Sequence, residues 1–277
     1  MSSGIVRDVN LVVGATGCLG SKICSRLLAR GKPVLAMVRG SSSAAAVARL
    51  REAGAEIVVG DLEGPDSLTA ACRGARTIVA TVQTPSGLPA LIAAAKEAAA
   101  SWFLYVSLAG LMNGGSRLER ETLGAERKLH DSGLARTILR PTFFMDTWLS
   151  PLVGFDLAAR RVRIYGSGDE RVAWITAGDV ADVAVACVDA PVVDRAVELR
   201  GPDSLSPLEI VELAEQIGGK AIEIERVPDS ALERHQDRAY AALLLCLARG
   251  GTMVPARLPP HLPKPQTRVR HFLRMAL

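Results

Sequence analysis

The feature that most constrains this chain is the glycine string GATGCLG at residues 14–20. The apolar run 9–13 before it is typical of a strand buried on both faces, and SKICSRLLARG after it has apolar residues at helical spacing and Gly31 as a stop. In such a strand–turn–helix unit the first glycine permits a tight turn, the second admits a pyrophosphate, and the third lets helix and strand pack closely. Free N–H groups at the start of the helix stabilise the phosphate charge. The loop therefore predicts a dinucleotide site that includes Gly14, Thr16, Gly17, Cys18, Leu19 and Gly20.

Strands and helices alternate through the first half of the chain, which predicts an α/β fold with a doubly wound parallel sheet. After the first strand, we expect strands at residues 33–38, 56–59, 77–81, 103–106 and 136–139. The helices expected between them cover residues 43–53, 66–72, 88–100 and 119–132.

The regular alternation breaks after Pro141. We then expect, in order, an irregular stretch to Pro151, a hairpin around 165–169, a helix at 179–190 and a strand at 197–199. A helix at 206–217 follows, with Ser206 as its N-cap and Pro207 as its first residue. After it we expect a strand at 221–227, a Pro-rich loop at 250–265 and a last helix at 269–275. We therefore predict a Rossmann domain from residues 6–150 and about 175–200. A smaller C-terminal substrate lobe takes residues 151–174 and 201–277 within the same continuous unit.

The residue after the second strand distinguishes NAD from NADP, because an acid binds a ribose 2′-hydroxyl whereas a basic residue binds a 2′-phosphate. Here it is Arg39, followed closely by Ser41 and two further serines. This favours NADP(H) over NAD(H), the alternative being a solvated surface arginine. Asp61 and Leu62 follow the third strand, where we expect them to flank the adenine, although Asp61 also suits a helix N-cap.

Several segments together resemble one family. They are GATGCLG, PVLAMVRG, GDLEGPDSL, FLYVSLAG, SGLARTILRPTFFMD, DVADVAVACVDAP and GPDSLSPLEIVELAEQIGGK, which cover nearly the whole chain. This pattern is similar to the NmrA-like branch of the short-chain dehydrogenase/reductase superfamily. The resemblance implies a Rossmann fold and a nicotinamide cofactor.

The chain departs from the proton-donating motif of these relatives, in which a Tyr is followed four residues later by a Lys and assisted by a Ser. None of its three Tyr residues has a Lys at that spacing: they are Tyr105, Tyr165 and Tyr240. Similar isoflavone-reductase-like enzymes carry a Lys four residues before a Glu; with Glu126 in the Glu position, the Lys position holds Thr122. We expect Lys128 to be solvated, and the polar face of this helix to consist of Glu119, Glu121 and Glu126.

Small polar residues follow the later strands, at the edge where ligands bind such sheets. Beside a nicotinamide we expect Thr81, Val82, Gln83, Ser107, Pro141, Thr142 and Phe143, each of which also suits a plain turn. The weak candidates for a catalytic hydrogen bond to the acceptor oxygen are Ser107, Gln83 and Thr142. An aromatic cluster follows the sixth strand, and it suits either a substrate pocket or the core of the second lobe: Phe143, Phe144, Trp148 and Phe155.

Three functions fit these residues. The first is an NADPH-dependent oxidoreductase that transfers hydride to a conjugated acceptor, such as a quinone or a related aromatic compound. Such an acceptor gives a stabilised phenolate that water protonates, so no strong acid is needed. The alternatives are a non-catalytic, redox-sensing NADP(H)-binding regulator and a biosynthetic reductase for one specialised metabolite.

Composition narrows the partners. The chain has 277 residues, 49% of them apolar, and a formal net charge of +4 without a basic run, which disfavours nucleic acid. The most apolar windows, 91–100 and 239–248, are too short to span a membrane.

The five cysteines show no metal-ligand spacing, so we expect no metal. The start of the helix near Cys18 would lower the pKa of the Cys18 thiol. The first residues lack a signal peptide, so we expect a cytoplasmic protein that acts on a small molecule.

Overall fold

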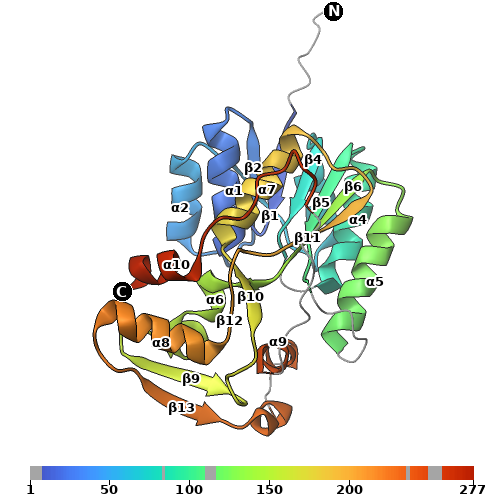
Figure 1. Ribbon diagram of the computed structural model, residues 1–277. Helices are drawn as coiled ribbons and strands as arrows, with labels where there is room; N and C mark the ends of the chain where they lie inside the picture. Colours follow the sequence, from blue (N-terminus) through green and yellow to red (C-terminus); the bar gives the residue numbers. More distant parts are fainter. Residues whose placement is uncertain (1–7, 83–84, 110–116, 235–237, 249–257) are drawn as a thin grey trace, which may run out of the picture.

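The main sheet of the protein consists of seven parallel strands (Figure 1). The computed structural model describes residues 8–82, 85–109, 117–234, 238–248 and 258–277. The strands are, in spatial order, β11 (Arg195–Leu199), β6 (Arg136–Pro141), β5 (Trp102–Val106), β4 (Thr77–Ala80), β1 (Asn10–Val13), β2 (Val34–Val38) and β3 (Glu56–Val59). The order reverses between β1 and β4, which places the ligand crevice of a doubly wound sheet at the carboxyl ends of these strands. The predicted fold class is confirmed.

Helices cover both faces of this sheet. One face packs against α1 (Cys18–Ala29), α2 (Ala44–Glu52) and α7 (Ala177–Asp189). The other packs against α3 (Pro65–Cys72), the short turn η1 (Pro85–Gly87), α4 (Leu88–Glu97) and α5 (Arg117–Asp131). Alternate strand residues point to opposite faces: Val12 and Leu104 are buried on the first, Leu11 and Phe103 on the second. Both sets are apolar because helices cover both faces.

The second lobe contains two sheets of three strands each. One consists of β12 (Ser204–Leu205), β10 (Val172–Ile175) and β7 (Phe143–Phe144); the other consists of β13 (Glu223–Val227), β9 (Arg161–Tyr165) and β8 (Phe155–Asp156). The helical elements around them are α6 (Met145–Trp148), η2 (Pro151–Val153), α8 (Pro207–Gly218), η3 (Asp229–Arg234), α9 (Arg238–Ala248) and α10 (Val269–Ala276). In Figure 1 these elements lie below the carboxyl ends of the main strands. The predicted cap is confirmed, since Ser206 and Glu209 form a capping box at the start of α8 and Pro207 is its first residue.

The hairpin predicted around residues 165–169 is wrong. β9 pairs with β8 and β13, whereas β10 pairs with β7 and β12. The turn between them contains Gly166 and Gly168, both with positive φ, at +70° and +80°. These glycines let the chain turn from one small sheet into the other.

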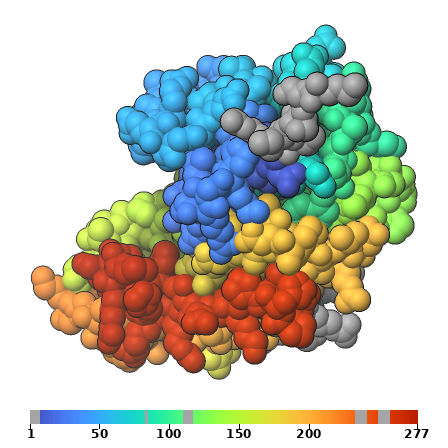
Figure 2. Space-filling view, turned by 90° about the horizontal axis from the view of Figure 1, so that it is seen from above, coloured from blue at the N-terminus to red at the C-terminus, as the bar shows by residue number. Residues whose placement is uncertain are grey.

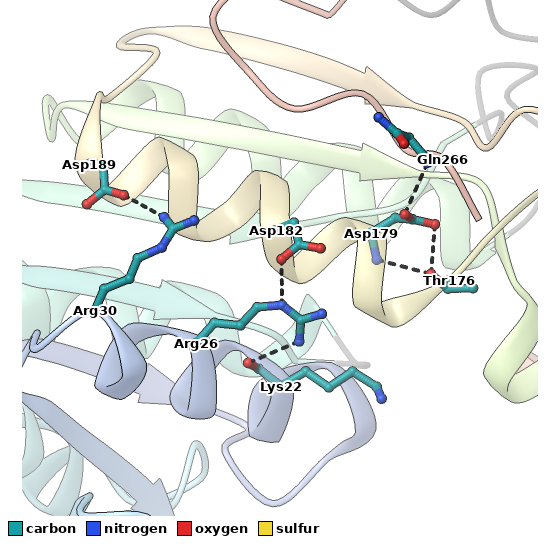
Figure 3. A network of polar contacts seen from close by, with 8 residues as sticks. All are labelled: Lys22, Arg26, Arg30, Thr176, Asp179, Asp182, Asp189 and Gln266. Atoms are coloured by element: carbon teal, nitrogen blue, oxygen red, sulfur yellow. Dashed lines mark hydrogen bonds and ion pairs between the residues drawn. The ribbon is translucent and has the colours of Figure 1, made fainter.

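Charged side chains join α1 to α7 (Figure 3). Arg26 binds Asp182 at 2.6 Å, and Arg30, at the C-terminal end of α1, binds Asp189 at 2.5 Å. Asp179, near the start of α7, accepts a hydrogen bond from the backbone N–H of Gln266 at 3.1 Å. The C-terminal segment therefore lies along α7, where Figure 2 shows it in red beside the gold surface of that helix.

Within the described ranges, no helix is both long enough and apolar enough to span a bilayer.

Candidate functional site

The glycine loop between β1 and α1 has little room for side chains. Gly14 has a φ of +83°, and a Cβ there would lie 2.6 Å from Oγ1 of Thr81. A Cβ at Gly20 would lie 2.1 Å from the carbonyl oxygen of Gly14. Both distances are far below van der Waals contact, so these positions require glycine. The N–H of Gly17 donates to the carbonyl of Gly14 at 3.0 Å and closes the turn.

The first turn of α1 is open to an anion. Its N-cap residue, Gly17, provides no side-chain hydrogen bond, and no acidic residue occupies the first turn. Thr16, Gly17 and Cys18 are exposed, whereas Leu19 is half-buried. Backbone N–H groups at a helix start carry partial positive charge and bind phosphate when no side chain caps them. The loop therefore fits the pyrophosphate of a dinucleotide.

Arg39 follows β2 at the same edge of the sheet. Its backbone N–H donates to Oγ of Ser42 at 3.0 Å, and the N–H of Ser42 donates back to the carbonyl of Arg39 at 3.0 Å. Within the described part of the chain, its exposed guanidinium has no hydrogen-bond or ion-pair partner. Ser41 is exposed too, and the first turn of α2 holds no acidic residue. The fixed turn presents a free cation beside the crevice.

Asp61 and Leu62 follow β3. Oδ1 of Asp61 accepts from the N–H of Glu63 at 3.0 Å, and the exposed carboxylate belongs to a local turn. It is not a helix N-cap, since that position before α3 is held by Gly64. Leu62 packs against η1, where a Cβ on Gly87 would lie 2.6 Å from Cβ of Leu62.

The polar groups expected beside a nicotinamide lie at the ends of β4, β5 and β6. Oγ1 of Thr81 donates to the carbonyl of Val13 at 2.9 Å, which ties β4 to the start of the glycine loop. Thr142 donates its N–H to the carbonyl of Leu199 at 2.9 Å, and its buried Oγ1 has no hydrogen-bond partner among the described residues. Val82 is half-buried and Pro141 is buried. Gln83 and its neighbour at 84 lie outside the described residues.

A buried polar network surrounds Ser107 at the end of β5. Ser107 Oγ lies 2.6 Å from Oε1 of Glu126 on α5, and Arg140 of β6 donates from Nε to the same oxygen at 3.0 Å. A second guanidinium nitrogen of Arg140 bonds the other oxygen of Glu126, and a third binds Glu198 of β11 at 3.0 Å. Helix α5 and strand β11 thus hold Arg140 between two carboxylates, and these bonds raise its pKa.

This network corrects the expected polar face of α5. Glu126 is only 6% exposed and Glu119 only 4%, so both carboxylates lie inside the protein, while Glu121 is exposed and binds Arg117 at 2.6 Å. Glu126 is stable there because Arg140 and Ser107 satisfy both of its oxygens. The network also includes Tyr105, whose pKa burial and the Glu126 charge raise to about 12.

The aromatic cluster contributes mainly to the core of the second lobe. Trp148 and Phe155 are buried, and Phe143 packs edge-on against Trp148 with 5.7 Å between the ring centroids. Phe143 and Phe144 are half-buried. Two cavities, of about 580 and 690 Å³, lie elsewhere: one beside Val192 and Pro259, the other beside Gly166 and Val227.

The predicted lowering of the Cys18 pKa is wrong. Partial burial and then the nearby Asp146 carboxylate raise the pKa of this thiol, and Lys22 opposes them only in part. The contact joins Cys18 Sγ to Asp146 Oδ1 over 3.6 Å. In the described ranges, no three His, Cys, Asp or Glu side chains come together as metal ligands.

The sheet order, the glycine loop and the uncapped start of α1 define a Rossmann-fold nucleotide-binding protein. Residues 14–191 match the family described as NAD(P)H-binding, and the chain belongs to that family. This match and the relatives below confirm the resemblance to the NmrA-like branch.

Three known proteins illustrate the relationship. The chain is 32% identical over 224 residues to an NAD(P)H azoreductase of Xenophilus azovorans, covering 76% of this chain and 74% of the relative. It superposes with a TM-score of 0.82 on the triphenylmethane reductase of Citrobacter sp. complexed with NADP(H), at 18% identity over 97% of this chain and 100% of that one. A TM-score of 0.77 relates it to an NADPH-dependent quinone oxidoreductase of Escherichia coli, at 22% identity over 96% and 98% of the two chains. The last two show a shared fold.

Proposed function

We propose that this protein is an NADPH-dependent oxidoreductase that transfers hydride to a conjugated small-molecule acceptor, a quinone or a related aromatic compound. The observation that carries the proposal is that the hydroxyl groups of Thr81 and Ser107, at the ends of β4 and β5, are already hydrogen-bonded within the protein. The nearby Tyr105 has a raised pKa of about 12. Among the described residues at these two strand ends, none of these hydroxyl groups is a strong acid, which suits an acceptor whose reduced form is a stabilised anion.

The described residues fit a bound dinucleotide. The loop Gly14–Gly20 and the start of α1 would hold the pyrophosphate, and Asp61 with Leu62 would flank the adenine. Thr81, Val82, Ser107, Pro141, Thr142 and Phe143 would surround the nicotinamide together with Gln83. The reduced nicotinamide supplies the hydride, so the chain has to bind, orient and exclude water.

NADP(H) is preferred over NAD(H) in this proposal. Arg39 is exposed, without a described partner, and held beside the crevice by its turn with Ser42. A guanidinium binds a phosphate through two parallel hydrogen bonds, and Ser41 adds a hydroxyl. The first turn of α2 carries no acid that would repel a 2′-phosphate.

The acceptor would lie between the nicotinamide and the second lobe. Phe143 and Phe144 are half-buried at the start of that lobe, with Trp148 behind Phe143. An aromatic edge of this kind suits a flat conjugated molecule. Residues 6–150 with about 175–200 would form the cofactor domain, and 151–174 with 201–277 the substrate lobe. The named relatives support the reductase, since one reduces azo compounds by its name and another reduces quinones.

The test follows NADPH absorbance with purified protein and a panel of quinones and azo dyes, with NADPH binding measured by calorimetry in parallel. We expect oxidation that saturates with one of the acceptors. Tight binding of NADPH without turnover on any of them would contradict the enzyme and favour a regulator that binds the dinucleotide.

A further inference from the structure

The hydroxyl group of Ser107 has a fixed direction. Ser107 is 3% exposed, and its Oγ lies 2.6 Å from Oε1 of Glu126. Glu126 receives two further hydrogen bonds from the guanidinium of Arg140, so both of its oxygens already act as acceptors. Oε1 accepts from the Ser107 hydroxyl as well. The one proton of the Ser107 hydroxyl must therefore lie between Ser107 and Glu126.

What remains on Ser107 is acceptor capacity. A hydroxyl has one proton and two lone pairs, and the proton is engaged. Toward a ligand, the Ser107 oxygen can therefore only accept a hydrogen bond.

The position of Ser107 indicates which ligand atom its oxygen meets. Ser107 directly follows β5, which is the second strand from β1 on the β4 side of the switch point. The glycine loop after β1 holds the pyrophosphate, and the adenine side extends toward β2 and β3. The nicotinamide side therefore extends toward β4, β5 and β6. The carboxamide of the nicotinamide carries an N–H₂ donor, whereas a quinone oxygen can only accept.

We propose that Glu126 is a positioning residue that makes Ser107 a hydrogen-bond acceptor for the carboxamide N–H of the nicotinamide. Ser107 then orients the cofactor ring and does not bind the oxygen of the hydride acceptor. Arg140, between Glu126 and Glu198, holds the Glu126 carboxylate in place. This assignment rests on the proposed function for the identity of the cofactor.

The experiment compares NADPH with its reduced 3-acetylpyridine analogue, in which a methyl ketone replaces the carboxamide. The analogue keeps the carbonyl oxygen and lacks the N–H donor. Calorimetry gives the dissociation constant of each compound for the wild type, Ser107→Ala and Glu126→Gln. Glu121→Gln is the matched control, because Glu121 lies on the same helix but is exposed and paired with Arg117. Thermal unfolding of each variant establishes that it is folded.

We expect the wild type and Glu121→Gln to bind NADPH roughly 3- to 10-fold more tightly than the analogue, as one neutral hydrogen bond provides. Ser107→Ala should weaken NADPH binding by the same factor, leave the analogue unchanged and so abolish the preference. Glu126→Gln should also reduce the preference, because an amide N–H can donate to Ser107 and free the serine proton. Ser107→Ala leaves the bonds between Arg140 and Glu126 in place, so we expect this variant to fold even where Glu126→Gln does not. It therefore tests by itself whether Ser107 accepts the hydrogen bond from the carboxamide N–H.

Two results would overturn the assignment in distinguishable ways. Ser107→Ala could instead keep the wild-type ratio of the two dissociation constants and raise the KM for the quinone. Ser107 would then bind the oxygen of the hydride acceptor, and the assignment to the carboxamide would fail while the proposed function would stand. If the folded wild type does not bind NADPH, the proposed function fails with it.

Discussion

The thiol of Cys18 lies 3.6 Å from Oδ1 of Asp146, and Oδ2 of the same carboxylate accepts a hydrogen bond from the N–H of Ala177 at 2.7 Å. Cys18 is the first residue of α1, Asp146 belongs to α6, and Ala177 begins α7. One carboxylate thus connects the glycine loop and the start of α1 to the second lobe. It also acts against the helix start, because burial and the Asp146 charge together raise the pKa of Cys18.

A raised pKa predicts slow alkylation of Cys18. The thiolate is the reactive form, so at neutral pH we expect iodoacetamide to modify Cys18 more slowly than a free cysteine. Asp146→Asn keeps an oxygen for the Ala177 N–H but removes the negative charge, and it should speed the reaction severalfold. Mass spectrometry of the peptide that contains Cys18 measures the rate, with Cys246 in the same sample as the reference. An unchanged rate in Asp146→Asn would show that its charge does not control the thiol.

The close packing at Gly20 predicts that an added methyl group weakens cofactor binding. A Cβ there would lie 2.1 Å from the carbonyl oxygen of Gly14, so Gly20→Ala must displace the loop or the start of α1. We expect the NADPH dissociation constant to rise by at least about tenfold, since in the proposed function the N–H groups of that segment bind the phosphate. Gly124→Ala is the control: position 124 is helical, nothing lies within 4 Å of the added Cβ, and alanine favours a helix. Equal affinities in the two variants would refute the role of the loop.

The fold was predictable because its signals are local. The strand expected at residues 56–59 is observed over Glu56–Val59, and the cap at Ser206 is observed as predicted. Strand runs, glycine turns and caps each depend on neighbouring residues, so the sequence carries them directly. The hairpin predicted after Tyr165 is wrong because β13 and β7, the parallel partners of β9 and β10, lie far away in the sequence, and no local pattern specifies these pairings.

The network around Ser107 was missed for a different reason. A charged residue on an amphipathic helix is generally solvated, and Glu126 was interpreted in that way. The available signal was its spacing: the buried stripe of α5 contains Thr122 and Leu129, four residues before and three residues after Glu126. Arg140 at the end of an apolar strand was the second signal, because a buried carboxylate requires a cation.

Arg39 predicts the cofactor preference. Arg39→Asp replaces a free cation with an anion, which would repel a 2′-phosphate and bind a ribose 2′-hydroxyl. We expect NADPH affinity to fall by about tenfold or more, as loss of a hydrogen bond to a charged group implies, while NADH affinity stays equal or rises. Arg127→Asp, at an exposed position of α5, makes the same change in net charge and should leave the NADPH-to-NADH ratio unaltered. The assignment fails if the two variants give the same ratio in fluorescence titrations.

The ion pairs between α1 and α7 predict a small loss of stability in acid. Burial alone would raise the pKa of Asp189, but Lys32 and then Arg30 outweigh it and lower the pKa. A carboxyl whose pKa is lower in the folded state stabilises the protein above its unfolded pKa of about 3.9, and this contribution disappears as the pH falls through the folded value. The side chain of Asp189 is 42% exposed, so solvent screening limits the contribution to less than about 1 kcal/mol.

Asp189→Asn should therefore lower Tm slightly at neutral pH, and the difference from the wild type should vanish as the pH falls well below 4 or as salt is added. Asp169→Asn, at an exposed position in the turn between β9 and β10, provides the control in the same calorimetric series. A difference between the wild type and Asp189→Asn that stays constant with pH would exclude the ion pair as its cause.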